Sequence, residues 1–156
     1  MSKVFHIIFI LFPTIYIVTG KISTYSPYIF LSMTSPNSDN STSAFDSKLE
    51  SILELLEEEG SQHFIYLTGA AGTGKTTLIE RVKDECLLRK IVVAPTGVAA
   101  LNIGGSTINS AFRIGFDTFP NIQESKDPRF KKLLKKLELL IIDEISMVRA
   151  PMLDAI

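Results

Sequence analysis

The chain has 156 residues, a formal net charge of −1 and 46% hydrophobic residues. This length suits one domain with its own core, and the near-neutral charge gives no overall signature of nucleic-acid binding. The single cysteine, Cys86, excludes an internal disulfide. The two histidines are isolated, so no cluster of ligands predicts a zinc site.

The first 31 residues form an apolar N-terminal segment that we expect to lie outside the folded domain. Its apolar run, residues 4–18, is short for a transmembrane helix, and Pro13 interrupts it. The run resembles the core of a signal peptide. Three interpretations stay open: a targeting segment, an apolar tail, or an upstream region wrongly included in the chain. We favour the last two, which leaves membrane contact undecided.

The next stretch, residues 32–44, is polar and low in complexity, which predicts a disordered linker. We place the folded domain at residues 45–156. Apolar residues recur at helical spacing over residues 45–56, which predicts an N-terminal helix. A short apolar run at residues 63–67 then predicts a buried strand.

A phosphate-binding loop follows that strand. Residues 69–76 read Gly-Ala-Ala-Gly-Thr-Gly-Lys-Thr and fit the pattern G-x-x-x-x-G-K-[ST] between a strand and a helix. Glycines let the backbone N–H groups approach an anion, and the helix N-terminus adds a positive dipole end. The residues expected to bind ATP are Gly69, Ala70, Ala71, Gly72, Thr73, Gly74, Lys75, Thr76 and Thr77.

The segment after the loop helix begins with a strand at residues 91–94, which Pro95 ends. A short helix from Gly97 to Ile103 is expected next, then a loop over residues 115–127. A helix over residues 130–136 carries several lysines, for which a solvated face is the favoured interpretation.

An apolar strand at residues 139–143 ends in two adjacent carboxylates, Asp143 and Glu144. With the loop upstream, we expect Thr76 and Asp143 to hold Mg²⁺, which accepts few protein ligands and keeps several waters. Lys75 would reach the β- and γ-phosphates as a catalytic residue. Glu144 is the candidate general base that activates water.

The order of these elements predicts a three-layer α/β domain of the P-loop NTPase (RecA-like) class, with a parallel sheet. Its crossovers should be right-handed, and ligands should lie at the carboxyl ends of the strands. A helix beginning near Pro151 closes the predicted set.

Three segments in this order carry a family resemblance. They are the loop at residues 69–76, the stretch Pro-Thr-Gly-Val-Ala-Ala-Leu-Asn-Ile-Gly-Gly-Ser-Thr at residues 95–107, and Asp-Glu-Ile-Ser-Met at residues 143–147. Together they resemble the PIF-type DNA helicases, a branch of the superfamily-one helicases related to RecD. The middle segment is the most specific of the three. The resemblance spans roughly residues 46–156.

This resemblance implies ATP-dependent unwinding of DNA, with movement from 5′ to 3′ on single-stranded DNA. It also implies roles in DNA repair, DNA recombination and telomere maintenance, and an intracellular protein of the nucleus or mitochondrion in a eukaryote. By position, the residues implied to contact DNA are Thr96, Gly97, Asn102, Gly104, Gly105 and Thr107. Small residues let a phosphate approach backbone N–H groups.

The family's later motifs and its second motor domain would lie beyond Ile156. In related folds, a strand after the second motif inserts between the loop strand and the Asp-Glu strand, so this sheet is expected to lack its centre. We therefore expect an incomplete motor domain that does not unwind DNA by itself. Two alternatives stay open: another P-loop ATPase or kinase, possibly membrane-anchored, and a non-catalytic remnant. Oligomeric state is not predicted.

Overall fold

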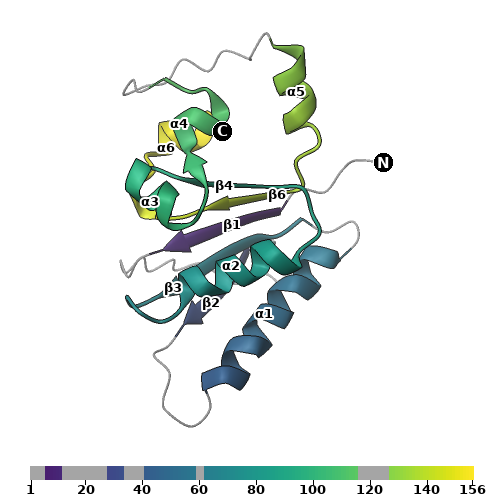
Figure 1. Ribbon diagram of the computed structural model, residues 1–156, viewed down its shortest axis with the longest axis vertical. Helices are drawn as coiled ribbons and strands as arrows, with labels where there is room; N and C mark the ends of the chain where they lie inside the picture. Colours follow the sequence, from purple (N-terminus) through teal and green to yellow (C-terminus); the bar gives the residue numbers. More distant parts are fainter. Residues whose placement is uncertain (1–5, 12–27, 34–40, 59–61, 116–126) are drawn as a thin grey trace.

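The computed structural model describes residues 6–11, 28–33, 41–58, 62–115 and 127–156. These residues include a single parallel sheet in the order β2-β3-β1-β6-β4-β5 (Figure 1). The strands are β1 (His6–Leu11), β2 (Tyr28–Met33), β3 (Phe64–Gly69), β4 (Lys90–Ala94), β5 (Ser106–Thr107) and β6 (Leu139–Ile142).

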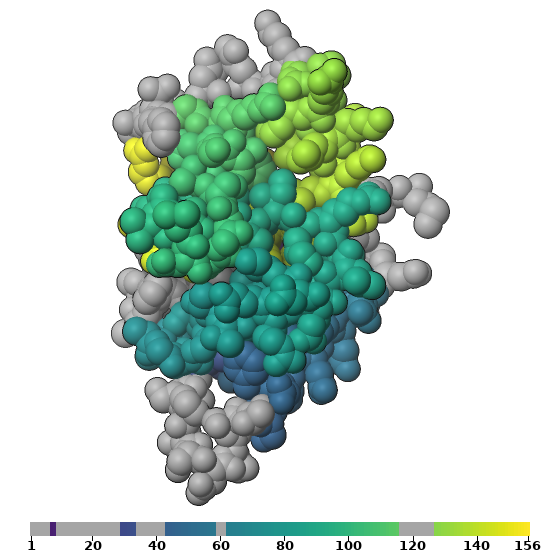
Figure 2. Space-filling model, viewed as in Figure 1, coloured from purple at the N-terminus to yellow at the C-terminus, as the bar shows by residue number. Residues whose placement is uncertain are grey.

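Helices connect and cover these strands. They are α1 (Ser41–Glu57), α2 (Lys75–Glu85), α3 (Gly97–Asn102), α4 (Ile108–Phe112), α5 (Pro128–Leu134), α6 (Ala150–Asp154) and the 3₁₀ turn η1 (Ile145–Met147). In the space-filling view, α2 and the segment from α3 to α4 cover the front of the molecule (Figure 2). Within the described ranges, the helices are too short or too polar to cross a bilayer.

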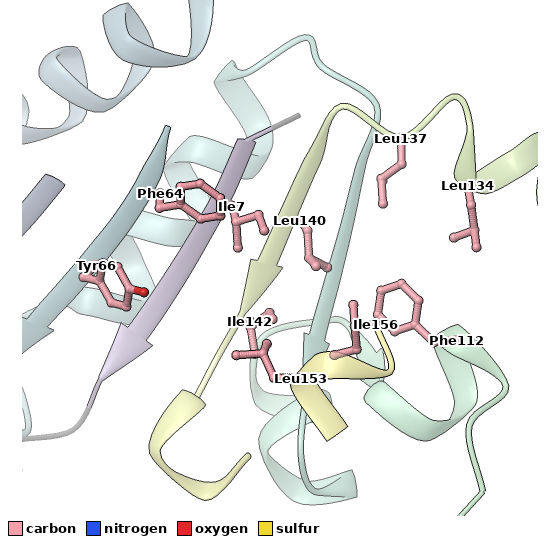
Figure 3. A pocket seen from close by; sticks show the side chains of 10 residues that line it. All are labelled: Ile7, Phe64, Tyr66, Phe112, Leu134, Leu137, Leu140, Ile142, Leu153 and Ile156. Carbon is pink, nitrogen blue, oxygen red and sulfur yellow. The ribbon is translucent and has the colours of Figure 1, made fainter. Parts of the chain in front are cut away.

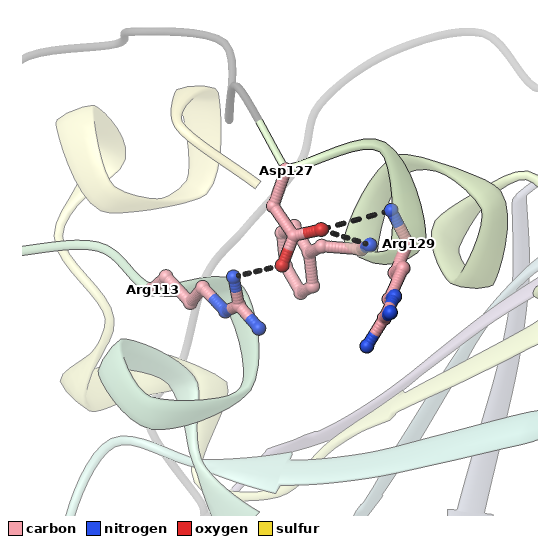
Figure 4. Close-up of polar contacts among 4 residues, drawn as sticks. Arg113, Asp127 and Arg129 are labelled. Atoms are coloured by element: carbon pink, nitrogen blue, oxygen red, sulfur yellow. Dashed lines mark hydrogen bonds and ion pairs between the residues drawn. The ribbon is translucent and has the colours of Figure 1, made fainter.

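Side-chain caps explain where several short helices begin. The Asp127 carboxylate accepts hydrogen bonds from the N–H groups of Arg129 and Phe130, at 2.9 and 3.4 Å, and so starts α5. Its other oxygen accepts a 2.9 Å hydrogen bond from the Arg113 guanidinium at the end of α4 (Figure 4). The Arg113 contact and the N-cap bonds lower the pKa of Asp127. One carboxylate therefore ties the end of α4 to the start of α5.

Side chains alternate along each strand, so the sheet has two faces, and helices cover one face more completely than the other. On one face, α1 and α2 bury Ile65, Leu67 and Ile141 completely. On the other face, α4 and α6 pack only partly over the sheet. A pocket of about 420 Å³ remains there, and the side chains that line it are apolar except for the Tyr66 hydroxyl (Figure 3). Helices thus flank a parallel sheet on both faces, and the predicted α/β P-loop fold class is confirmed.

The N-terminal part of the chain differs from the expectation. Residues 6–11 and 28–33 form β1 and β2 of the sheet, so they belong to the domain that was predicted to begin at residue 45. A continuous apolar run suits a central parallel strand buried on both faces, and the same pattern is found in a signal-peptide core. Hydropathy does not distinguish the two.

Two further expectations, the disordered linker at residues 32–44 and the missing centre of the sheet, also differ from the structure. Ser32 and Met33 end β2 and residues 41–44 lie in α1, while residues 34–40 of the expected linker lie outside the described ranges. The centre of the sheet is filled, because β1 lies between β3 and β6. Three further elements, β5, α4 and η1, were not expected; each is five residues or shorter.

Candidate functional site

All strands of the sheet run in the same direction, so the turns that follow β3, β6 and β4 meet at one edge (Figure 1). The phosphate loop follows β3, the two acids follow β6, and the segment that begins at Pro95 follows β4. This edge is the usual position of ligands in parallel α/β sheets. The topology therefore brings together three segments that lie far apart in the sequence.

The phosphate loop has a backbone that only glycine adopts easily. Gly72 and Gly74 have φ angles of 77° and 86°, in the left-handed region where a Cβ is strained. Gly69 is needed for a different reason: a Cβ there would lie 2.5 Å from the carbonyl oxygen of Met33. Inside the loop, the Thr73 hydroxyl donates a 2.9 Å hydrogen bond to the Ala70 carbonyl.

Lys75 begins α2, and its ammonium group turns back over the loop. It donates hydrogen bonds of 2.6 and 2.7 Å to the carbonyl oxygens of Gly69 and Ala70. The residue is 7% exposed. Burial lowers the pKa of Lys75, and the nearby charge of Asp143 opposes that shift. The loop thus holds a largely buried cation at its centre.

Asp143 directly follows β6, and hydrogen bonds fix both its backbone and its side chain. Its N–H donates a 2.9 Å hydrogen bond to Val93 of β4, and its carboxylate accepts one of 2.9 Å from the Glu144 N–H. Burial raises the pKa of Asp143, and the charge of Glu144 raises it further. The Glu144 N–H and the charge of Lys75 oppose this rise. The site therefore holds a partly desolvated carboxylate beside a buried ammonium.

Glu144 adopts an uncommon backbone conformation, with a φ of 52°. Residues other than glycine rarely adopt this region, and such residues cluster at functional sites. The conformation ends β6 sharply and starts η1. The two adjacent acids lie directly after β6, and their expected roles as metal ligand and base stay predictions.

The remaining predicted nucleotide-site residues lie around this centre. Ala71, Thr76 and Thr77 are exposed, which leaves the Thr76 hydroxyl accessible to a ligand. The Thr76 hydroxyl and the Asp143 carboxylate both offer oxygen, the ligand type that Mg²⁺ prefers. A hydrated Mg²⁺ with a polyphosphate therefore fits the donors present here.

The middle segment forms a strand end, two short helices and the turn between them. The Thr96 hydroxyl caps α3 by accepting from the Ala99 N–H, and Thr107 caps α4 by accepting from the Ser110 N–H, both at 3.2 Å. The other implied DNA-contact residues, Gly97, Asn102, Gly104 and Gly105, are exposed. Two threonines of the set therefore have structural roles in addition to any contact with a ligand.

Three residues that the sequence did not single out also contact these segments. The Lys83 ammonium donates a 2.5 Å hydrogen bond to the Ile103 carbonyl and lies beside Gly104. Met33 and Phe45 lie against the glycines of the phosphate loop. Lysine and methionine carry no positional signal in a helix or a strand, so only the fold brings these contacts to light.

Comparison with known proteins gives consistent results. The sequence model of the PIF1-like helicase family matches residues 38–156. The ATP-dependent DNA helicase Pif1 of Campylobacter jejuni is 38% identical over 104 residues, covering 59% of this chain and 23% of the relative. Its Saccharomyces cerevisiae counterpart, PIF1, is 41% identical over 117 residues, covering 67% of this chain and 13% of the relative.

Solved structures of Bacteroides Pif1 are also similar. The complex with single-stranded DNA has a TM-score of 0.60 and 39% identity, and the match covers 72% of this chain and 26% of that one. The complex with ADP-AlF4 has the same TM-score and identity over 70% of this chain and 26% of that one. This chain thus spans between 13% and 26% of the length of these relatives. It belongs to the PIF1-like helicase family.

Proposed function

We propose that this chain supplies the ATP-binding part of a DNA helicase that moves from 5′ to 3′ on single-stranded DNA. The observation that carries the proposal is that the phosphate loop after β3 and the two acids after β6 lie at the same end of one parallel sheet. Relatives named as ATP-dependent DNA helicases support the assignment. They are much longer than this chain, so unwinding is proposed for a protein that includes this segment, and not for the segment by itself.

The residues at the carboxyl ends of β3 and β6 are proposed to have separate roles in ATP binding and hydrolysis. The loop amides and the Lys75 ammonium would stabilise the phosphate charge, and Thr76 and Asp143 would hold Mg²⁺. When bound, Mg²⁺ neutralises charge on the phosphate oxygens. Glu144 would accept a proton from the attacking water, as a carboxylate next to the metal ligand is placed to do.

The middle segment is proposed to contact the DNA backbone. Gly104 and Gly105 are exposed and carry no side chain that would keep a phosphate away, although their own N–H groups donate to the Leu101 and Ala100 carbonyls, and Asn102 adds an exposed amide. Thr96 and Thr107 accept hydrogen bonds from their helices, yet each hydroxyl keeps its own O–H to donate to a phosphate oxygen. The solved complex of Bacteroides Pif1 with single-stranded DNA supports this partner. Roles in repair, recombination and telomere maintenance, in a compartment that holds DNA, follow as proposals from the family.

The test measures nucleotide binding, monitored by the fluorescence anisotropy of a labelled ATP analogue in the presence of Mg²⁺. Lys75→Ala removes one charged donor, so we expect affinity to fall by roughly 10- to 150-fold, the equivalent of about 1.5–3 kcal/mol. Lys135→Ala, on an exposed lysine beside α5, is the matched control and should leave affinity unchanged. Equal affinity for both variants would contradict the proposal.

DNA binding separates the helicase assignment from other P-loop classes. A labelled oligo-dT should bind the chain, and Asn102→Ala should weaken that binding without lowering the Tm, because Asn102 is exposed. Nucleotide binding with no affinity for single-stranded DNA would favour another P-loop ATPase or a kinase. Absence of both activities would favour a non-catalytic remnant.

A further inference from the structure

A second pocket lies at the edge of the sheet opposite the proposed nucleotide site. It is formed where β4 begins and where the chain passes from α5 to β6 (Figure 1). Its volume of about 410 Å³ is within the range of about 300–1,000 Å³ that is common for ligand sites. The residues that line this basic pocket are cationic or aliphatic: Arg89, Lys90, Lys132, Lys136, Ile91, Leu133 and Leu137.

Backbone hydrogen bonds hold the two walls of the basic pocket together. The Arg89 carbonyl accepts hydrogen bonds from the N–H groups of Glu138 and Leu139, at 2.9 and 3.1 Å. The Glu138 carboxylate in turn accepts a 3.0 Å hydrogen bond from the Arg89 N–H. These bonds connect the start of β4 to the segment after α5. Cations from two separate parts of the chain are therefore held around one hollow, which is more than a charged face on a single helix.

The positive charge of the pocket is not neutralised by its own walls. None of its four cations forms an ion pair with another described residue. The Lys90 ammonium donates a 2.5 Å hydrogen bond to the Cys86 carbonyl, which positions the group and leaves its charge in place. Lys132 and Lys136 are exposed at and just after the end of α5. The pocket thus presents uncompensated positive charge to a ligand.

The uncharged part of the lining is aliphatic and partly open to solvent. Leu133 is 54% exposed, and Leu87, in the connection that leads to Arg89, is 98% exposed. Among the described residues, no aromatic ring lines the pocket. Sites for single-stranded nucleic acid stack bases on aromatic side chains, and phosphate contacts require no aliphatic surface. The lining therefore suits a ligand that combines carboxylates with an apolar side chain.

We propose that the basic pocket binds an acidic peptide segment of a partner protein through an apolar anchor. Carboxylates of the segment would pair with Lys132 and Lys136, and the anchor would lie against Leu133 and Ile91. Charge complementarity of this kind fixes the partner's register and excludes basic segments. The proposal does not depend on the proposed function, because the pocket and the phosphate loop lie at opposite edges of the sheet.

The first test measures the fluorescence anisotropy of a labelled peptide of alternating Asp and Leu. Lys132→Glu with Lys136→Glu reverses two charges that line the pocket. Lys131→Glu with Lys135→Glu changes the net charge equally, on neighbouring residues outside the lining. Because like charges repel across an interface, we expect affinity to fall at least about tenfold in the first variant and less than about threefold in the second. Equal losses, or a parent chain that does not bind the peptide, would overturn the proposal.

The second test isolates the apolar anchor. A peptide of alternating Asp and Ser keeps the charge and lacks the anchor, so it should bind the parent chain at least about fivefold more weakly. Leu133→Ser should weaken binding of the Asp–Leu peptide and leave the Asp–Ser peptide unchanged. Equal affinity of the parent for the two peptides would show that no anchor is recognised and would refute the proposal.

Other occupants of the pocket would give different results, each of which contradicts an acidic peptide as the ligand. Labelled oligo-dT, or vesicles that contain phosphatidylserine, could lose affinity for the Lys132→Glu, Lys136→Glu variant while the Asp–Leu peptide does not. That result would assign the pocket to nucleic acid or to a membrane surface. Sedimentation that finds a dimer of the parent and a monomer of this variant, again with unchanged peptide affinity, would assign the pocket to a second copy of the chain.

Thermal melts and binding of a labelled ATP analogue show whether the variants are folded. Both should match the parent, because the substituted lysines are exposed. If the charge-reversal variant does not fold, Lys132→Gln with Lys136→Gln removes the two charges and should still weaken peptide binding about threefold; a folded variant with parental affinity would overturn the proposal. Lys75→Ala should bind the peptide as the parent does, so failure of the nucleotide site and failure of the basic pocket are separate results.

Discussion

The charges of Lys75 and Asp143 act on each other across the sheet edge, although the two residues follow different strands. This attraction does not offset the cost of burial: the pKa of Lys75 is lowered and the pKa of Asp143 is raised, in both cases mainly by desolvation. Each group is therefore less stable in its charged form than it is in water. A ligand that supplies opposite charge to both would relieve that cost.

Asp143→Asn should stabilise the nucleotide-free chain and abolish its response to Mg²⁺. The pKa of Asp143 is raised after all its interactions are combined, so its charge is a net cost to the folded state at neutral pH. The amide keeps the shape of the side chain and removes that charge. We expect a higher Tm without ligand, and a nucleotide affinity that is the same with Mg²⁺ as with EDTA. Asp84→Asn, at an exposed position of α2, is the control and should change neither quantity.

The same substitution should have a defined pH dependence. A carboxyl whose pKa is raised on folding binds its proton more tightly in the folded state, so its contribution destabilises the fold as pH rises above the unfolded value of 3.8. The Tm advantage of Asp143→Asn should be full at neutral pH and should disappear as pH falls toward that value. Thermal melts of both proteins across this range measure the difference. An advantage that grows on acidification would contradict the assignment.

Lys83→Met should weaken the connection between the phosphate-loop helix and the middle segment. The Lys83 ammonium donates to Ile103, at the end of α3, from the last turn of the helix that Lys75 begins. Loss of a charged hydrogen bond costs about 1.5–3 kcal/mol, so we expect a lower Tm and a severalfold weaker affinity for oligo-dT. Lys135→Met is the control. Unchanged DNA affinity at a reduced Tm would restrict Lys83 to a structural role.

Two glycines of the middle segment should respond differently to alanine. A Cβ at Gly105 would lie 2.5 Å from the Val92 carbonyl oxygen, whereas a Cβ at Gly97 would meet nothing within 4 Å. Gly105→Ala should therefore destabilise the fold by about 1–3 kcal/mol, as overpacking does. Gly97→Ala should be neutral or stabilising by up to about 1 kcal/mol, since α3 begins there. Urea denaturation measures both, and similar values would argue against the close approach of Gly105 to β4.

The sequence predicted the elements whose signals are local. The phosphate loop needs glycines and a lysine at fixed spacing, and an apolar strand that ends in Asp143 is clear in the sequence. The parallel order of these elements then places Lys75 and Asp143 at the same edge. The phosphate loop, the two acids and the fold class could therefore be predicted from sequence patterns and from the order of the elements.

Long-range pairing was not accessible in this way. The sequence of residues 6–11 does not predict pairing with Ile65 and Ile141, because any apolar run of that length fits the pattern of a buried strand. The two-residue strand β5 and the contact of Lys83 with Ile103 depend on close approach of distant backbone segments. Single-sequence patterns contain no record of such approaches.

The pairing of β1 has a consequence for how the chain folds during synthesis. Both neighbours of β1 are translated after it, and His6 meets its partner Leu139 only when nearly the whole described chain has left the ribosome. Until then β1 can pair only with β3, and its other edge stays unpaired, a state that favours aggregation in slow-folding parallel sheets. Although β1 precedes both its partners in the chain, it is among the last of the described strands to be paired on both edges, and chaperones that shield apolar strands should raise the yield of native protein.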